Sequence, residues 1–425
     1  MNWLLLGVAI AAALLLSMVA RLRWPGIGMP LLVASVLRFP VGLIGFHAVP
    51  IRLPYSGHDA VGFEQAAWRI ASAGWPAVLD ALNPLTGFHM VAPFSVIYAL
   101  VGREPYALVG YNVILGVMTV AVVYGIGYQV AEHRAARWCA WAMAVFPAAI
   151  LMSSLVLRES GVGFGVALGI LGVAGAMRHR TAPWVLLSTA GFALASLLHG
   201  GMLIPAIALL TFLSVSEFRN SAKGSRVRLR STLVAASVIT LVAAAVWIST
   251  TNQVSFASFG TLDMETAESQ ILSENPRVGL GGSAYYGDVT TESWAEAASQ
   301  LPVRLGLFMF SPMPWTVSSY TQLIGLLDGF FWLFMCIVLV RTRKRWWGDP
   351  VLRALFVFGV AAIIVFALGT TNAGTALRHR TKIIPAILPL LMVTLLSGRR
   401  DREAWQTGQA REQHRGHILN HEAHL

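Results

Sequence analysis

The sequence predicts an all-α polytopic membrane protein with about eleven transmembrane helices and a few short re-entrant or interfacial helices. Of its 425 residues, 56% are hydrophobic and only 12% are charged, against roughly 25% charged in an average soluble domain. The mean hydropathy of +0.65 comes from apolar runs long enough to cross a bilayer core, which takes about 20 helical residues. This composition argues against a water-soluble enzyme.

The predicted spans are apolar runs bounded by charged residues, Gly or Pro. They cover residues 3–20, 27–48, 106–130, 137–157, 160–177, 183–199, 201–215, 232–250, 319–341, 351–368 and 383–397. The first run has no basic start and no clear small-residue cleavage site, so we expect a retained helix, with a signal anchor as the alternative. Two further apolar stretches, 89–101 and 305–317, are too short to span and contain prolines, which is typical of re-entrant or interfacial helices.

Lys and Arg in the short loops predict the orientation, because cytoplasmic loops carry the excess of positive charge. Eleven spans with the N-terminus outside place every basic turn in the cytoplasm. These turns hold Arg21 and Arg23, Arg134 and Arg137, Arg178 and Arg180, the cluster from Arg219 to Arg230, the cluster from Arg341 to Arg345, and the tail from Arg399. The net charge of +11 therefore reflects topology, and we expect no nucleic-acid partner.

This topology predicts one integral membrane domain, 1–397, followed by a cytoplasmic tail, 398–425. Two outer loops, about 49–102 and 251–303, are where chemistry in water could take place. The second loop is acidic, which supports its outer position but also fits a solvated surface. We expect a multi-pass protein of the cytoplasmic (inner) membrane with an active site on the outer, periplasmic side.

Motifs of nucleotide-driven and metal-dependent soluble enzymes are missing from the sequence. It contains no Walker A loop, HExxH, nucleophile elbow or CxxC motif, which argues against a nucleotide-driven pump. Gly161, Gly163, Gly165 and Gly169 in the fifth span predict close helix packing rather than a phosphate loop, because no strand precedes them. No metal site is assigned.

Asp59, in the first outer loop, is the candidate general base. The segment after it predicts an amphipathic helix, with Phe63, Ala67 and Ile70 on one face. An aspartate at the start of a helix also caps it and meets the positive end of the helix dipole, so capping alone would explain the residue. A general base must be an ionised carboxylate that a substrate hydroxyl can reach, and Asp59 fits this requirement as well as any acid in the chain.

The pattern Asp59, Phe63, Ala67, Gly74, Trp75 resembles the first outer-loop motif of the GT-C superfamily of integral membrane glycosyltransferases, of the protein O-mannosyltransferase and aminoarabinose-transferase type (family 39-like). The resemblance continues to about residue 180, through a span with Tyr111-Asn112, then Phe146-Pro147 and Arg158-Glu159, and covers the remainder only by layout. It implies transfer of a sugar from a polyprenyl-phosphate carrier to an acceptor at the outer face of the membrane, with Asp59 as the base.

One departure concerns the second acid. The family often has an acid directly after the first, whereas this chain has Ala60. Glu64 and Glu159 are therefore the candidate partners of Asp59. The resemblance leaves room for a divalent cation, but this departure weakens a metal-dependent reading. His58, beside Asp59, is a candidate for orienting the acceptor, with a satisfied hydrogen bond as the alternative.

Cations for the departing lipid phosphate are expected in the last outer loop, where Arg378, Arg380 and Lys382 directly precede the span at 383–397. Basic residues on the outer side call for a partner, and a phosphate is a natural one. Contact with membrane lipid headgroups or with the acidic outer loop is the alternative. Arg158 is expected to pair with Glu159, to position a substrate or to contact the same phosphate, and Arg38, inside the second span, to face the protein interior or to extend outward.

The sequence therefore predicts a hexosyl- or pentosyltransferase of the cell envelope, with no certain cofactor. It acts on a polyprenyl-phosphate sugar donor and a glycan, lipid or protein acceptor. The alternatives are a polymerase or ligase of lipid-linked glycans, which needs no carboxylate base, a lipid-linked sugar transporter or flippase, and a catalytically inactive scaffold. A transporter would place its charges deep within the spans and show repeated halves. The sequence shows no such repeat.

Overall fold

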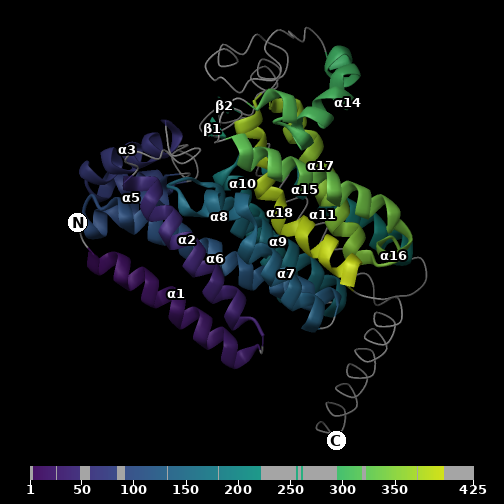
Figure 1. The fold of residues 1–425 in the computed structure, drawn as a ribbon, viewed down its shortest axis with the longest axis horizontal. Helices are drawn as coiled ribbons and strands as arrows, with labels where there is room; N and C mark the ends of the chain where they lie inside the picture. The colour runs from purple at the N-terminus through teal and green to yellow at the C-terminus, as the bar shows by residue number, and fades with distance from the viewer. Residues whose placement is uncertain are drawn as a thin grey trace, which may run out of the picture.

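The computed structural model describes residues 3–24, 26–47, 58–83, 91–131, 133–179, 181–221, 255–256, 260–261, 294–317, 322–370 and 372–396 (Figure 1). The helices are α1 (Trp3–Arg23), α2 (Gly28–His47), α3 (His58–Ser72), α4 (Trp75–Leu82), α5 (Ala92–Val101), α6 (Pro105–Val130), α7 (His133–Val145), α8 (Pro147–Ser154), α9 (Glu159–His179), α10 (Ala182–Leu198), α11 (Leu203–Ser221), α14 (Trp294–Phe310), α15 (Gln322–Arg341), α16 (Arg343–Trp346), α17 (Pro350–Gly369) and α18 (Ala373–Leu396). Short 3₁₀ turns cover Gly200–Met202 and Pro314–Thr316. Two-residue strands, β1 (Ser255–Phe256) and β2 (Gly260–Thr261), pair antiparallel.

The expected class, an all-α polytopic membrane protein, is confirmed. Within the described residues, five helices are long and apolar enough to cross a membrane, or up to six if the bent pair α7 and α8 forms one span. Shorter apolar helices include α5, α10 and parts of α2 and α11. The sequence predicts eleven spans, of which 232–250 lies outside the described residues, as do most of the acidic outer loop and the tail.

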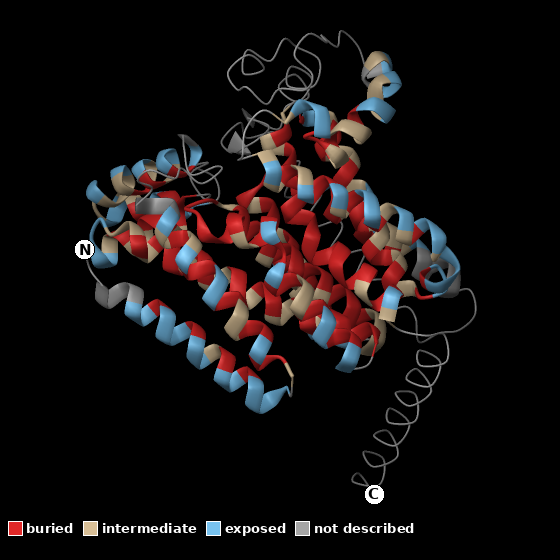
Figure 2. Cartoon of the chain, in the orientation of Figure 1, coloured by how far each residue is buried: buried red, intermediate tan, exposed pale blue. Residues whose placement is uncertain are grey.

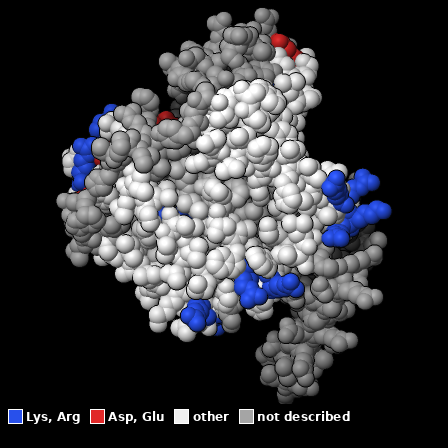
Figure 3. All heavy atoms as spheres, viewed as in Figure 1, with Lys and Arg blue, Asp and Glu red and all other residues white. Residues whose placement is uncertain are grey.

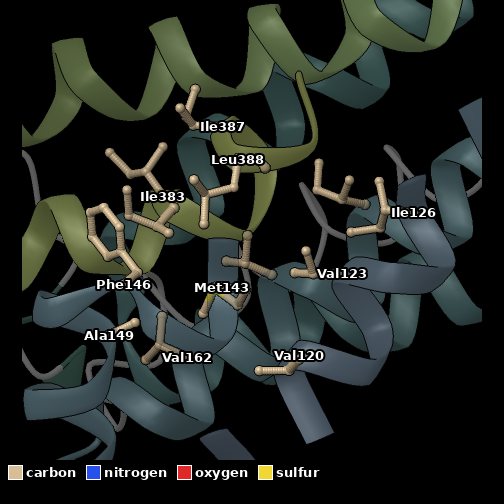
Figure 4. Close-up of a cluster of buried hydrophobic side chains, with 14 of the residues drawn as sticks. Val120, Val123, Ile126, Met143, Phe146, Ala149, Val162, Ile383, Ile387 and Leu388 are labelled. Atoms are coloured by element: carbon tan, nitrogen blue, oxygen red, sulfur yellow. The ribbon is translucent and has the colours of Figure 1, made fainter. Parts of the chain in front are cut away.

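Buried hydrophobic side chains fill the space where α6, α7, α8, α9 and α18 meet (Figure 2). Figure 4 shows apolar side chains from these helices gathered around one another, among them Val120, Val123 and Ile126, Met143, Ala149, Val162, and Ile383, Ile387 and Leu388. In contrast, α1 lies along one side of the bundle and exposes much of its surface (Figure 2). Exposed apolar side chains are expected on a helix that faces lipid.

Small residues bring α9 and α10 close together, as the glycine pattern predicts. A Cβ atom on Gly165 would lie 2.8 Å from the main-chain nitrogen of Ala195, and one on Gly191 would lie 2.8 Å from the main-chain oxygen of Gly165. A side chain at either position would force the helices apart. These glycines therefore serve helix packing in the membrane.

The basic turns lie at one end of the bundle. Arg178, at the end of α9, donates to the main-chain oxygen of Gln129 at the end of α6 and pairs at 2.7 Å with Asp349, which precedes α17. Arg137 packs against Gly26, between α1 and α2. Figure 3 shows Lys and Arg side chains along the lower and right-hand edges of the molecule and a further group at its upper left edge.

The predicted fourth span, 137–157, is broken in the structure. α7 and α8 meet at an angle of 58°, and residues 155–158 form an irregular segment before α9. Pro147 begins α8 and Phe146 before it is extended, because proline lacks a main-chain N–H and disfavours the helical conformation of the preceding residue. The prediction of one continuous helix over 137–157 was therefore wrong.

The predicted start of the last span was also wrong, because α18 begins at Ala373, ten residues before 383. The side chain of Asn372 accepts hydrogen bonds from the main-chain nitrogens of Gly374 and Thr375 at 2.7 and 3.3 Å, an N-cap that starts the helix there. Arg378, Arg380 and Lys382 are therefore helical. Residues 305–310 of the stretch predicted at 305–317 belong to α14, which starts at Trp294, and the remainder contains the 3₁₀ turn Pro314–Thr316.

Candidate functional site: an ion-pair cluster where α3, α9 and α18 meet

Three helix starts meet at the end of the bundle opposite the basic turns. Asp59 lies in the first turn of α3, Glu159 begins α9, and Arg378 lies in the second turn of α18. The irregular segment before α9 is held by Asn112 of α6, which donates to the main-chain oxygens of Leu155 at 2.6 Å and Leu157 at 3.0 Å. Asn112 thereby fixes the position from which α9 starts.

Arg378 joins the two predicted acids. Its Nη1 donates to Oδ2 of Asp59, while Nε and Nη2 donate to Oε1 of Glu159 at 3.0 and 2.8 Å. Charge-assisted bonds of this kind are about twice as strong as neutral ones. The partners are 319 and 219 residues away along the chain. Of the two candidate partners of Asp59, the structure therefore brings Glu159 to it.

Lys382 extends the cluster inward. It lies four residues after Arg378, so both cations project from the same face of α18. Its Nζ is 3.5 Å from Oε1 of Glu159 and donates to Nδ1 of His379 at 3.1 Å. The imidazole of His379 stacks on Phe366, with ring centroids 4.3 Å apart, and lies 5.1 Å from that of His199. His379 is not among the site residues predicted from the sequence.

Exposure decreases along this chain of groups. The side chain of Asp59 is 60% exposed and that of Arg378 is 13% exposed, whereas Glu159 and Lys382 are buried. A buried charge is tolerated when it is paired, and removal of one partner costs about 3–5 kcal/mol. Asp59 is therefore the most accessible of these four groups, and Glu159 and Lys382 are the least accessible.

Arg158 is the third cation of the cluster. Its guanidinium carbon lies 5.9 Å from the centroid of the Phe63 ring on α3, and it interacts electrostatically with Glu159 and Asp59. Arg158, Arg378 and Lys382 thus face two carboxylates. This grouping is counted over the residues that the structure describes.

Glu64 lies outside this cluster. Its carboxylate accepts two hydrogen bonds from Arg103, at 2.9 and 3.0 Å, and one from the Tyr98 hydroxyl at 2.9 Å. Burial alone would raise the pKa of Glu64, but the bonds from Arg103 and Tyr98 outweigh it and lower the pKa below its ordinary value. Glu64 fastens α3 to α5.

Arg380 also lies apart from the cluster. It is fully buried, pairs with Asp328 of α15 at 2.7 Å and donates to the main-chain oxygens of Phe308 and Ser311 at 2.7 and 2.9 Å. These contacts tie α14 and α15 to α18. His58 is the first residue of α3, and its side chain lies outside the description.

Carboxylates and histidines do not gather as a metal site in the part of the chain that the structure describes, where no group of three His, Cys, Asp or Glu could hold a metal ion. Asp59 and Glu159 instead share a guanidinium group. No chemical step is therefore assigned to a divalent cation.

No protein-family model matches the chain, and no curated protein matches its sequence. Among solved structures, it is similar to the apo oligosaccharyltransferase of Archaeoglobus fulgidus, with 13% sequence identity and a TM-score of 0.49. It is also similar to the oligosaccharyltransferase AglB of the same organism in complex with an inhibitory peptide and a dolichol-phosphate, with 15% identity and a TM-score of 0.45. The matches cover 86% and 73% of this chain but 50% and 42% of those chains, so the chain spans about half their length. Function is therefore argued from the residues of the site.

Proposed function

We propose that the protein is a glycosyltransferase that moves a sugar from a polyprenyl-phosphate donor to an acceptor hydroxyl at the outer face of the cytoplasmic membrane. The observation that supports this most directly is the cluster in which Arg378 bridges the exposed carboxylate of Asp59 and the buried carboxylate of Glu159. Asp59 remains in water when Arg378 releases it, so a donor phosphate can take its place at the guanidinium group.

Asp59 is the proposed general base, because its carboxylate is the exposed member of the cluster. Without substrate, Arg378 holds this carboxylate. A donor phosphate competes for the Nη1 of Arg378, while the bonds from Nε and Nη2 to Glu159 keep the guanidinium in place. Donor binding thus frees Asp59 to accept a proton. The base becomes available when the donor is present.

The transfer is a direct displacement. The acceptor oxygen attacks the anomeric carbon and its proton passes to the Asp59 carboxylate. The bond between the anomeric carbon and the phosphate oxygen breaks, the oxygen keeps the electron pair, and polyprenyl phosphate leaves with inverted configuration at the sugar. Arg378 and Arg158 stabilise the developing charge on the phosphate. Glu159 and Lys382, both buried, are positioning residues.

The proposal includes hexosyl and pentosyl transfer and a glycan, lipid or protein acceptor. A sugar transporter is less well supported, because the sequence shows no repeated halves. A polymerase or ligase of lipid-linked glycans would use the same cations but would not need Asp59. That residue therefore decides between the two enzymatic alternatives.

The test is transfer of label from radiolabelled polyprenyl-phosphate sugars to membrane acceptors. We expect Asp59→Asn to lower transfer by more than about a hundredfold at equal membrane abundance, as loss of a general base does. Asp80→Asn, an exposed acid on α4, is the matched control and should transfer at the wild-type rate. Equal transfer by Asp59→Asn would favour a polymerase or ligase, and no transfer by the wild type from any such donor would contradict the proposed donor.

A further inference from the structure

A small cavity lies among buried side chains of α2, α6, α8, α9 and α18. Its volume is about 20 Å³, and a single water molecule needs roughly 10–15 Å³. The polar residues that line it are Arg38, Thr119, Ser153, Glu159, Ser160 and Thr381. A cavity with this lining differs from a dry apolar void, because a water in it would find the two to four polar partners that it requires.

Arg38 supplies the charge on one side of the cavity. It is fully buried within α2 and donates to Oγ of Ser153 at 2.8 Å and to the main-chain oxygens of Met143 and Ala144 at 3.2 and 2.9 Å. These oxygens belong to the last turn of α7, where helix carbonyls lack partners and the dipole is negative. Arg38 therefore stabilises the break between α7 and α8, the pair that leads to Arg158 and Glu159.

Glu159 supplies a hydrogen-bond acceptor to the same cavity lining. Its Oε1 receives both Arg378 and Lys382, whereas its buried Oε2 finds no hydrogen-bond donor among the residues that the structure describes. The same holds for the buried hydroxyl of Ser160, the next residue in α9. Buried polar atoms in proteins almost always have a partner, and where no protein group serves, an ordered water does.

We propose that this cavity is a buried water site that completes the hydrogen bonding of Glu159, and that Arg38, which also lines it, is a positioning residue for the ion-pair cluster. The water donates to Oε2 of Glu159 and orients the carboxylate, so that Oε1 remains on Arg378 and Lys382. This inference rests on the proposed glycosyl transfer where it is tested by KM for the donor. The infrared test described below does not depend on that transfer.

Gly163 allows a selective test. It lines the cavity, and the nearest atom to a Cβ built on it is Cγ of Pro385 at 4.0 Å, so Gly163→Ala adds a methyl group without a clash. We expect the methyl group to displace the water and to raise KM for the lipid-phosphate donor by about tenfold, the effect of losing one hydrogen bond to a charged group. kcat should change less. The control is Gly7→Ala on α1, where no atom lies within 4 Å and the gain in helix propensity is the same.

A dry cavity gives the opposite result. In that case the methyl group fills a void, so Gly163→Ala would raise the melting temperature and leave KM unchanged, and the proposal would be overturned. Arg38 is tested by Arg38→Met and Arg38→Lys. The first should raise KM as Gly163→Ala does, and the second should partly restore it. Arg38→Met with wild-type KM would contradict the positioning role.

Infrared spectroscopy provides the readout that needs no activity. The carboxylate stretch of Glu159 is identified by its loss in Glu159→Gln. It should shift in Gly163→Ala and stay in place in Gly7→Ala, in membranes without donor. An unshifted band overturns the water site. A shifted band in a protein that transfers no sugar would instead refute the proposed function and leave the water site standing.

Discussion

Arg378 and Arg380 lie two residues apart on α18, yet their guanidinium groups have different surroundings. Arg378 keeps part of its side chain exposed and bonds two carboxylates, one of which, on Asp59, faces solvent. Arg380 is fully buried and is held by Asp328 and by two main-chain oxygens at the end of α14. Arg378 therefore lies at the solvent-facing end of the ion-pair cluster, whereas Arg380 is enclosed by protein.

The two arginines differ in whether a substrate anion can replace their carboxylate partner. A donor phosphate can replace Asp59 at Arg378 without leaving a buried charge unpaired, because Asp59 remains in water. Replacing Asp328 at Arg380 would leave a carboxylate in the bundle interior, which is costly. A basic residue in a span therefore indicates a binding site only if its counter-ion can be released to solvent.

The largest effect is expected from Arg380→Met. It leaves Asp328 buried and unpaired, which should destabilise the fold by about 3–5 kcal/mol. Melting temperature and folded yield in detergent measure this loss. The double variant Arg380→Met with Asp328→Leu removes both charges and should recover most of the stability. A stable Arg380→Met with a raised donor KM would instead place Arg380 in the substrate site, as the sequence predicted.

A smaller effect is expected from Arg378→Lys. Lysine keeps the charge but cannot hold two carboxylates with a planar fork, so kcat/KM for the donor should fall by about ten- to a hundredfold, the value of one to two charge-assisted bonds. Stability should change little. Arg69→Lys, an exposed arginine on α3, is the matched control. Unchanged kinetics in Arg378→Lys would show that charge alone suffices there.

The sequence predicted the local part of the site. The turn before α3, the amphipathic face with Phe63 and the acid at position 59 are features of neighbouring residues, and α3 runs from His58 to Ser72 with Asp59 in its first turn. Phe146-Pro147 is also a local indication of the break after α7, although the segment was predicted to form one span.

The rest of the site depends on contacts between side chains that are far apart in the sequence. A run of basic residues before an apolar stretch usually marks a loop, and only the acids of α9 and α15 allow Arg378 and Arg380 to be buried in a helix. A usable signal was the spacing of four between Arg378 and Lys382, which places both on one helix face. Glu64 and Glu159 were equivalent in sequence. The structure distinguishes them, because Arg103 binds Glu64 whereas Arg378 binds Glu159.

Glu64→Gln tests that distinction and should have the smallest effect. Because the folded-state pKa of Glu64 is lowered, its ionised form stabilises the protein above the unfolded-state pKa of about 4.3, and this stability is lost as pH falls through the folded-state value. The variant should therefore melt a few degrees below the wild type at neutral pH, and the gap should narrow on acidification.

Sugar transfer by Glu64→Gln at neutral pH should stay at the wild-type level, since Glu64 binds Arg103 and Tyr98 rather than Arg378. The comparison with Glu159→Gln is decisive, because both changes remove one negative charge and retain the shape of the side chain. Loss of transfer in Glu159→Gln alone assigns the catalytic geometry to the cluster on α18. Equal loss in both, with the melting temperature of Glu64→Gln unchanged, would mean that the donor reaches α5 as well and that the site is larger than the ion-pair cluster.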